Sequence, residues 1–244
     1  MKTSVNQVAA FGKLVGFCNA HGPMYNPSKA SIKVAALDSL LTSAGETLTA
    51  ANVSRTAFEN AIIARVQAFD ELPALSSRML AALRACGASV ETLSYARNIR
   101  RSFHSKRKVS PASAPATGEV SGAAVTNDLP KRSFSQVSYD SKVNNFARLV
   151  ERMSIEPLYQ PNEVDLQIPA LEAFVTKLRN ANNGVINAVV ARSNARITRN
   201  NLLFGPNGIH GIAMEVKDYL KSVFGPSSEQ YKQVSPLRFR TINY

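Results

Sequence analysis

Two groups of basic residues have a spacing that suits the binding of an anion. Arg192, Arg196 and Arg199 lie at i, i+4 and i+7, so a helix would place their guanidinium groups on one face. The second group runs from a predicted helix into the segment after it and consists of Arg97, Arg100, Arg101, Lys106, Arg107 and Lys108. Both groups are candidate contacts for nucleic acid or another polyanion. No aromatic residues alternate with these arginines, and no helix-turn-helix or zinc-finger spacing is present, which argues against sequence-specific recognition.

No arrangement of residues predicts catalysis or a metal centre. The histidines at positions 21, 104 and 210 have no cysteine, histidine or acid at ligand spacing. The glycine-rich stretch GPNGIHG lacks the Lys-Ser/Thr pair of a phosphate-binding loop and reads as a connection between helices. We therefore expect no enzymatic activity, no metal and no cofactor.

The composition is that of a globular protein with an excess of positive charge. The 244 residues include 29 Lys and Arg against 17 Asp and Glu, a net charge of +12, with 45% hydrophobic residues. Such a charge suits a polyanionic partner, but it is also common in soluble proteins with a basic pI.

No apolar run is long enough to span a membrane and the N-terminus does not resemble a signal peptide, so we expect a cytoplasmic protein. Cys18 and Cys86 could form one disulfide or remain free thiols.

The chain that must position these residues contains an internal repeat. The stretch PMYNPSKASIKVAALDSLL, which begins at Pro23, returns at Pro157 as PLYQPNEVDLQIPALEAFV, an offset of 134. Further landmarks follow in the same order at offsets of 135 to 138, and we match Phe69 with Phe204 and Met79 with Met214. A preserved order of landmarks over about a hundred residues indicates a duplicated unit.

The repeat predicts two tandem domains separated by a linker. We place the first helical bundle (repeat 1) at 1–104 and the second (repeat 2) at 136–244. Residues 105–135 between them are rich in Ser, Ala, Pro and Gly, a composition typical of an extended linker.

Each repeat reads as four helices, and no segment alternates as a strand would, so the predicted fold is all-α with two up-down bundles. The second helix of each repeat is long and is expected to begin near Val34 and Pro169 and to end near Phe69 and Phe204. Gly87 and Gly225 are expected to end the third helices with a positive φ. Ser227, with Gln230 three residues later, has the spacing of a capping box for the last helix.

A Tyr-x-Pro turn joins the first two helices of each repeat. Proline fixes the backbone, and a tyrosine can bury its ring while its hydroxyl keeps a hydrogen bond. We therefore assign a structural role to the turn residues Pro23, Tyr25, Pro27, Pro157, Tyr159 and Pro161.

The arginine group at 192–199 also allows a structural interpretation. Its positions match Ala57, Ala61 and Ala64 in repeat 1, small residues that would let another helix approach closely. The arginines could form a solvated face, or pair with acids of their own repeat, which are Glu163, Asp165 and Glu172.

These features resemble a family of tandem-repeat helical proteins of Bacteroidota that has no assigned activity. The similarity rests on the Tyr-x-Pro turn, the ALDSLL and ALEAFV helix starts, NAVVARSNARITRN and the tail GPSSEQYKQVSPLRF. The resemblance implies a helical fold over most of the chain, and it carries no functional residue over to this sequence.

Two functions remain open from the sequence. The first is a non-enzymatic structural or scaffolding protein that binds a protein partner or assembles with itself into an oligomer or filament. The alternative is a nonspecific binder of nucleic acid or another polyanion.

Overall fold

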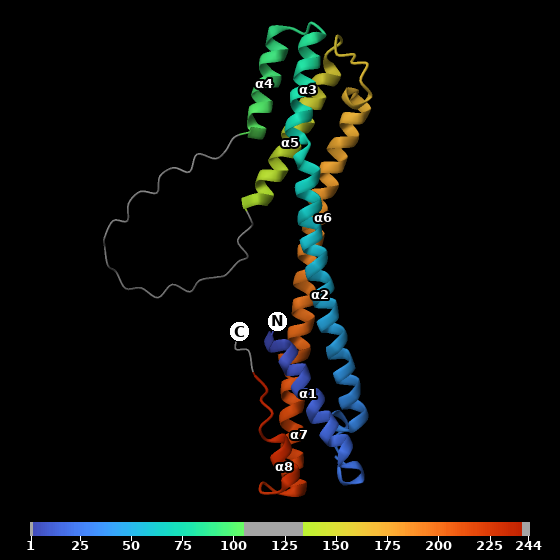
Figure 1. Cartoon of the computed structure of the whole chain (residues 1–244), viewed down its shortest axis with the longest axis vertical. Coiled ribbons are helices and arrows are strands. Elements are labelled where there is room, and N and C mark those ends of the chain that lie inside the picture. The colour runs from blue at the N-terminus through green and yellow to red at the C-terminus, as the bar shows by residue number, and fades with distance from the viewer. Residues whose placement is uncertain (1, 105–133, 241–244) are drawn as a thin grey trace, which may run out of the picture. The chain divides into compact units, whose positions relative to one another are not determined.

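The computed structural model describes residues 2–104 and 134–240, and within these ranges all regular structure is helical (Figure 1). The predicted all-α fold class is therefore confirmed. The helices are α1 (Lys2–Ala20), α2 (Val34–Asp70), α3 (Leu72–Ala85), α4 (Val90–His104), α5 (Phe134–Ile155), α6 (Ile168–Phe204), α7 (Ile209–Phe224) and α8 (Glu229–Val234). Most of the predicted linker, residues 105–133, lies outside the described residues. No described helix is both long enough and apolar enough to cross a membrane.

Equivalent helices recur in the two repeats, with the long pair of equal length. Helices α2 and α6 contain 37 residues each, and both follow a short 3-10 turn, η2 (Ala30–Ile32) or η3 (Val164–Leu166). Pro169 lies in the first turn of α6, where its missing N–H costs no helical hydrogen bond. The observed ends of both long helices agree with the expected ends to within one residue.

The chain forms two compact units that cut across the predicted bundles 1–104 and 136–244. Unit 1 combines residues 1–60 with 187–244, and unit 2 consists of residues 61–186. Each unit therefore takes its amino-terminal part from one repeat and its carboxyl-terminal part from the other. The physical reason is that the long helices α2 and α6 each carry the chain from one unit into the other, so each repeat contributes residues to both units.

Unit 1 is built around α1, which contacts α7 and α8 (Figure 1). Its core buries Phe11 and Leu14 of α1 fully, together with Leu37 of α2. From the other repeat it buries Leu203 at the end of α6 and Val216 of α7. Repeat 1 and repeat 2 thus share one hydrophobic core, and the burial of large side chains from both stabilises the unit.

Unit 2 has the equivalent core with the repeats exchanged. Helix α5 contacts α4, and Phe146 and Leu149 of α5 are fully buried. They pack in the same cluster as Leu171 of α6 and Met79 and Leu83 of α3. The ring of Phe146 meets that of Phe174 edge to face, with 5.4 Å between centroids.

The turn tyrosines make the same hydrogen bond in both units. Tyr25 is buried and its hydroxyl donates to the backbone oxygen of Ile32 at 2.6 Å. Tyr159 is also buried and donates to the backbone oxygen of Leu166 at 3.0 Å. Each hydroxyl therefore ties the turn to the 3-10 turn before the long helix, and its buried oxygen is satisfied.

The structure corrects the repeat register beyond the long helices. Met214 was matched with Met79, but Met214 is 43% exposed whereas Met79 is fully buried. The buried residues of α3 return in α7 at an offset of 137, so that Met79 corresponds to Val216. Within the long helices the offset stays at 134, and Phe69 corresponds to the buried Leu203. The four-residue connection between α6 and α7, against one residue between α2 and α3, accounts for the change.

Candidate functional site

The candidate site lies on the hairpin formed by α3 and α4 in unit 2. A Schellman turn ends α3: the N–H of Gly87 donates to Arg84 O at 3.2 Å, and that of Ala88 donates to Leu83 O at 3.4 Å. Gly87 has φ of +80°, a conformation that favours glycine, as the sequence predicted. The tight turn sends α4 back along α3, and it places Arg84 in the last turn of α3 beside the incoming helix.

Helix α4 begins with a side-chain cap and buries one face. Ser89 Oγ accepts a hydrogen bond from the backbone N–H of Thr92 at 3.2 Å, which satisfies one free donor of the first turn. Thr92, Ala96 and Ile99 are buried. Their spacing fixes the rotation of α4, so the residues between them fall on its two flanks and on its outer side.

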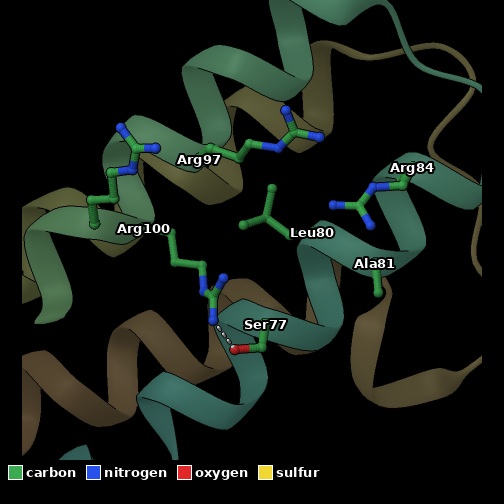
Figure 2. A pocket seen from close by; sticks show the side chains of 7 residues that line it. Ser77, Leu80, Ala81, Arg84, Arg97 and Arg100 are labelled. Atoms are coloured by element: carbon green, nitrogen blue, oxygen red, sulfur yellow. Dashed lines mark hydrogen bonds between the residues drawn. The ribbon is translucent and has the colours of Figure 1, made fainter.

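A pocket of about 540 Å³ lies between the two helices on one flank of α4. Its lining residues are Ser77, Leu80, Ala81, Arg84, Arg97, Arg100 and Arg101. Figure 2 shows Arg84 and Arg97 reaching toward the same space from facing helices, with Leu80 between them. Four arginines therefore line the pocket together with Leu80 and Ala81, and no carboxylate is among the lining residues.

A short hydrogen-bond relay holds Arg100 in place. Ser77 Oγ donates to the backbone oxygen of Pro73 at 2.7 Å and accepts from the Arg100 guanidinium at 2.8 Å (Figure 2). The Nε of Arg100 is buried and has no hydrogen-bond partner among the described residues. Because the Ser77 hydroxyl donates its proton to Pro73, its oxygen is left to accept from Arg100. This hydrogen bond orients the Arg100 guanidinium in the absence of a ligand.

The other three arginines of the pocket are unpaired within the described chain. Arg84, Arg97 and Arg101 are exposed and make no hydrogen bond or ion pair there. Like charges held at close range repel one another, and an anion in the pocket would remove that repulsion. Guanidinium groups also present several N–H donors in a planar fork that matches the oxygens of phosphate or carboxylate.

The opposite flank of α4 carries an aromatic side chain among arginines. Arg148 of α5 donates to the hydroxyl of Tyr95 at 2.9 Å, and the Arg152 guanidinium lies over the Tyr95 ring at 5.7 Å. Arg152 also donates to Thr92 Oγ1 at 2.9 Å. Tyr95 is 44% exposed. Arginines from α3 and α5 therefore line both sides of α4.

The two basic groups that the sequence proposed belong to different units of the structure. Arg97, Arg100 and Arg101 meet in the pocket, whereas Lys106, Arg107 and Lys108 lie outside the described residues. The 192–199 arginines belong to α6 in unit 1 and are not among the residues that line this pocket. Arg192 lies over the ring of Phe58 at 4.9 Å, and Arg199 donates to the Asn200 side chain at 2.8 Å. The acid Asp165, one of the proposed pairing partners of that group, pairs instead with Arg78.

Sequence reasoning missed Arg84, Arg148 and Arg152. Arg84 lies 13 residues before Arg97, and only the α3–α4 hairpin brings the two together. A signal was present, because a turn glycine between two apolar helices predicts an antiparallel hairpin whose facing flanks can be compared. Tyr95 and the α5 arginines are more than 50 residues apart, and no local pattern links them.

The described residues contain no group of three or more His, Cys, Asp or Glu that could hold a metal ion. The cysteines Cys18 and Cys86 are free. Comparison of the chain with protein-family models, curated proteins and solved structures finds no match.

Proposed function

We propose that the protein is a non-enzymatic helical protein that binds a polyanion, and that the phosphate backbone of nucleic acid is the ligand class. The observation that carries this proposal is the pocket of four arginines without a lining carboxylate. The arginines on the other flank of α4 extend the cationic surface, so that it suits a chain of phosphates better than one isolated ion. The net charge of +12 supports the same ligand class.

The proposed interaction is electrostatic and indifferent to base sequence. Exposed arginines contact phosphates and release counterions, so affinity should fall steeply with salt. Tyr95 offers an exposed ring edge that a base could contact, but Arg148 and Arg152 already occupy its hydroxyl and one ring face. Contacts with phosphates carry no base-sequence information directly.

The test compares two triple variants that remove the same charge. One replaces Arg84, Arg97 and Arg101 with Gln; the other replaces Arg192, Arg196 and Arg199 with Gln. A fluorescent single-stranded oligonucleotide of 20 nucleotides is titrated by anisotropy at several salt concentrations. We expect the pocket variant to lose at least about tenfold in affinity at low salt and up to about three contacts in the salt slope, and the matched variant to lose much less.

Two results would contradict the proposal. If wild-type protein does not bind at low salt, the pocket is not a nucleic-acid site. If the two triple variants weaken binding equally, the net charge of the protein accounts for the interaction and the pocket does not. Circular dichroism of all three proteins controls for folding, since exposed arginines contribute little to stability.

A second candidate function is the structural or scaffolding role, with self-assembly, that the sequence analysis placed first. The observation that favours it is a set of exposed apolar residues in unit 1, with Val53 of α2 and Val190 and Ile197 of α6 each more than half exposed. Exposed apolar residues often mark a contact with another protein where they form one contiguous patch. Light scattering separates the two roles, because apolar self-association persists in high salt whereas polyanion binding is lost.

A further inference from the structure

The two repeats touch each other through a turn-to-helix contact that occurs once in each unit. In unit 1 the η2 turn of repeat 1 contacts α7 of repeat 2, and Lys29 pairs with Glu215 at 2.6 Å. In unit 2 the η3 turn of repeat 2 contacts α3 of repeat 1. There Arg78 donates to both carboxylate oxygens of Asp165, with one of the distances at 3.1 Å.

The two contacts use equivalent positions with opposite charges. At the offset of 137 that relates the buried faces of α3 and α7, Arg78 corresponds to Glu215. At the offset of 134 that relates the turns, Lys29 corresponds to Glu163, and Asp165 lies two residues further on. Both the turn and the helix are thus cationic in repeat 1, with Lys29 and Arg78, and both are anionic in repeat 2, with Asp165 and Glu215.

This reversal makes only one of the possible pairings favourable. If a repeat folded on itself, or paired with the same repeat of a second molecule, the same positions would meet. Lys29 would then face Arg78, and the two acids of the η3 turn would face Glu215. Both contacts would bring like charges together, which opposes the pairing. The observed crossing places opposite charges together in both units.

Two other contacts form only because repeat 1 packs against repeat 2 in each unit. The Tyr219 ring of α7 lies edge-on to Tyr25 at 5.3 Å, and its hydroxyl accepts from the N–H of Asn26 at 3.1 Å, whereas the equivalent position of α3 is Ala82. A further ion pair joins Glu71 of repeat 1 to Lys177 of repeat 2 at 3.1 Å. In repeat 1 the residue equivalent to Lys177 is Ser43, so Glu71 would lose its partner if the repeat folded on itself.

We infer that repeat 1 and repeat 2 are unlike partners, each the specific docking partner of the other, and that the reversed charges at the turn-to-helix contact exclude pairing of like with like. The chain is then equivalent to a heterodimer whose two subunits are joined covalently. This inference goes beyond the proposed binding of a polyanion and does not depend on it, since none of the residues involved lines the arginine pocket.

The test offers the repeats a choice of partner. The full chain, with a site-specific protease sequence inserted between residues 110 and 126, is folded, cut, unfolded in urea and refolded by dilution. Native mass spectrometry then counts pairs of unlike and like halves, which differ in mass. We expect unlike pairs to exceed the statistical share in wild-type protein. A statistical mixture, or halves that do not associate, would overturn the inference.

Charge-reversed variants test whether these residues specify the pairing. Lys29→Glu with Asp165→Lys makes the crossed contacts repulsive and the like-with-like contacts attractive, so the ratio of unlike to like pairs should fall by about tenfold. Adding Arg78→Glu and Glu215→Lys restores opposite charges in the crossed arrangement, and the ratio should return toward that of wild type. A ratio that ignores the first pair of changes would overturn the role of the charges.

A second measurement needs no refolding. A carbodiimide joins amines to carboxylates in direct contact, and in the uncut wild-type monomer it should link Lys29 to Glu215 and Glu71 to Lys177. Mass spectrometry of the digested monomer identifies these links. If neither link forms in the monomer, or if both form only between molecules in a mixture of isotopically labelled and unlabelled protein, the crossed pairing within the chain is refuted.

Discussion

Units 1 and 2 have equivalent cores and differ at the last helix of each repeat, which is α8 in unit 1 and α4 in unit 2. In unit 2, α4 has 15 residues and forms the arginine pocket with α3. In unit 1 the equivalent helix α8 has only six residues and ends before Pro236. Lys217, which corresponds to the pocket residue Leu80, is buried there and donates to the backbone oxygens of Ser235 and Leu237. The tail of the chain thus occupies in unit 1 the side of the hairpin that unit 2 leaves open.

This difference between α4 and α8 indicates which positions of the two equivalent units can differ in sequence. Positions that fill the core are conserved in character between the units, as Phe11 and Phe146 illustrate, because a change of volume there destabilises the fold. The flank of the hairpin differs more: in unit 2 it carries the arginines of the pocket, and in unit 1 the tail residues Leu237 and Phe239 pack against the core. Burial lowers the pKa of Lys217, because removal from water disfavours its charged form.

The equivalence of the two cores can be broken most directly by truncating matched phenylalanines. Phe11→Ala and Phe146→Ala should each destabilise the protein by about 3–5 kcal/mol, because both side chains are fully buried. Phe146 also loses an edge-to-face contact with Phe174, so its truncation should cost about 1 kcal/mol more. Urea denaturation followed by circular dichroism measures both. A cost below about 1 kcal/mol for either variant would mean that the two cores are not equivalent.

The connection between the last long helix and α7 distinguishes unit 1 from unit 2, where a single residue joins α2 to α3. A Cβ on Gly205 would lie 2.4 Å from the backbone oxygen of Asn201, so Gly205→Ala should destabilise by about 1–3 kcal/mol. Gly184→Ala is the matched control, because its Cβ would meet nothing within 4 Å and alanine favours a helix interior by about 1 kcal/mol. Thermal unfolding should show opposite shifts; a neutral Gly205→Ala would mean that the loop relaxes freely.

The smallest expected effect on stability comes from the thiol of Cys18 in the core of unit 1. Burial raises the pKa of Cys18 from 9.0 to about 11, while the equivalent residue of unit 2 is Met153. The unfolded chain releases this proton first, so the stabilising contribution is full below pH 9 and is lost as the pH rises toward 11. We expect a loss of about 1 kcal/mol at pH 10 relative to pH 8 from this group.

Cys18→Met tests that assignment by giving unit 1 the residue of unit 2. Under reducing conditions the loss of stability between pH 8 and pH 10 should shrink in the variant. The remaining loss should come from groups such as Tyr159, whose pKa is raised to about 12 mainly by burial. An unchanged pH dependence would show that the Cys18 thiol is not the group that titrates.

The sequence predicted the helices well because their signals are local. The expected starts and ends of α2 and α6 lie within one residue of the observed ones, and Gly87 and Gly225 both have the positive φ that was expected. The last helix shows a small local error: its capping hydroxyl belongs to Ser228, which accepts from the N–H of Tyr231, and not to Ser227. Adjacent serines offer the same chemistry, and only the backbone geometry selects one of them.

The sequence did not predict which repeat packs against which. Apolar periodicity identifies the buried face of a helix and leaves its partner open, and the two repeats carry nearly the same apolar pattern. Folding each repeat on itself would therefore bury a similar surface. The distinguishing signal lies in single charges such as Lys29 and Glu215, and it becomes readable only once the corrected offsets are known. The pocket was missed in part for the same reason, since Arg84 and Arg97 meet through the hairpin and not through a shared motif.

The crossed composition of unit 1 has a consequence for the order in which the newly made chain folds. The first 60 residues belong to a unit whose remaining residues begin at Asn187, about 130 residues later. At a synthesis rate of about 5–20 residues per second, the α1 core face stays without its partner for about 6–25 seconds. Unit 2 is contiguous in the chain and can close first, whereas unit 1 also requires residues 187–244, which are made after those of unit 2. Closing so long a loop is entropically unfavourable and slow, so the refolding rate should be limited by unit 1.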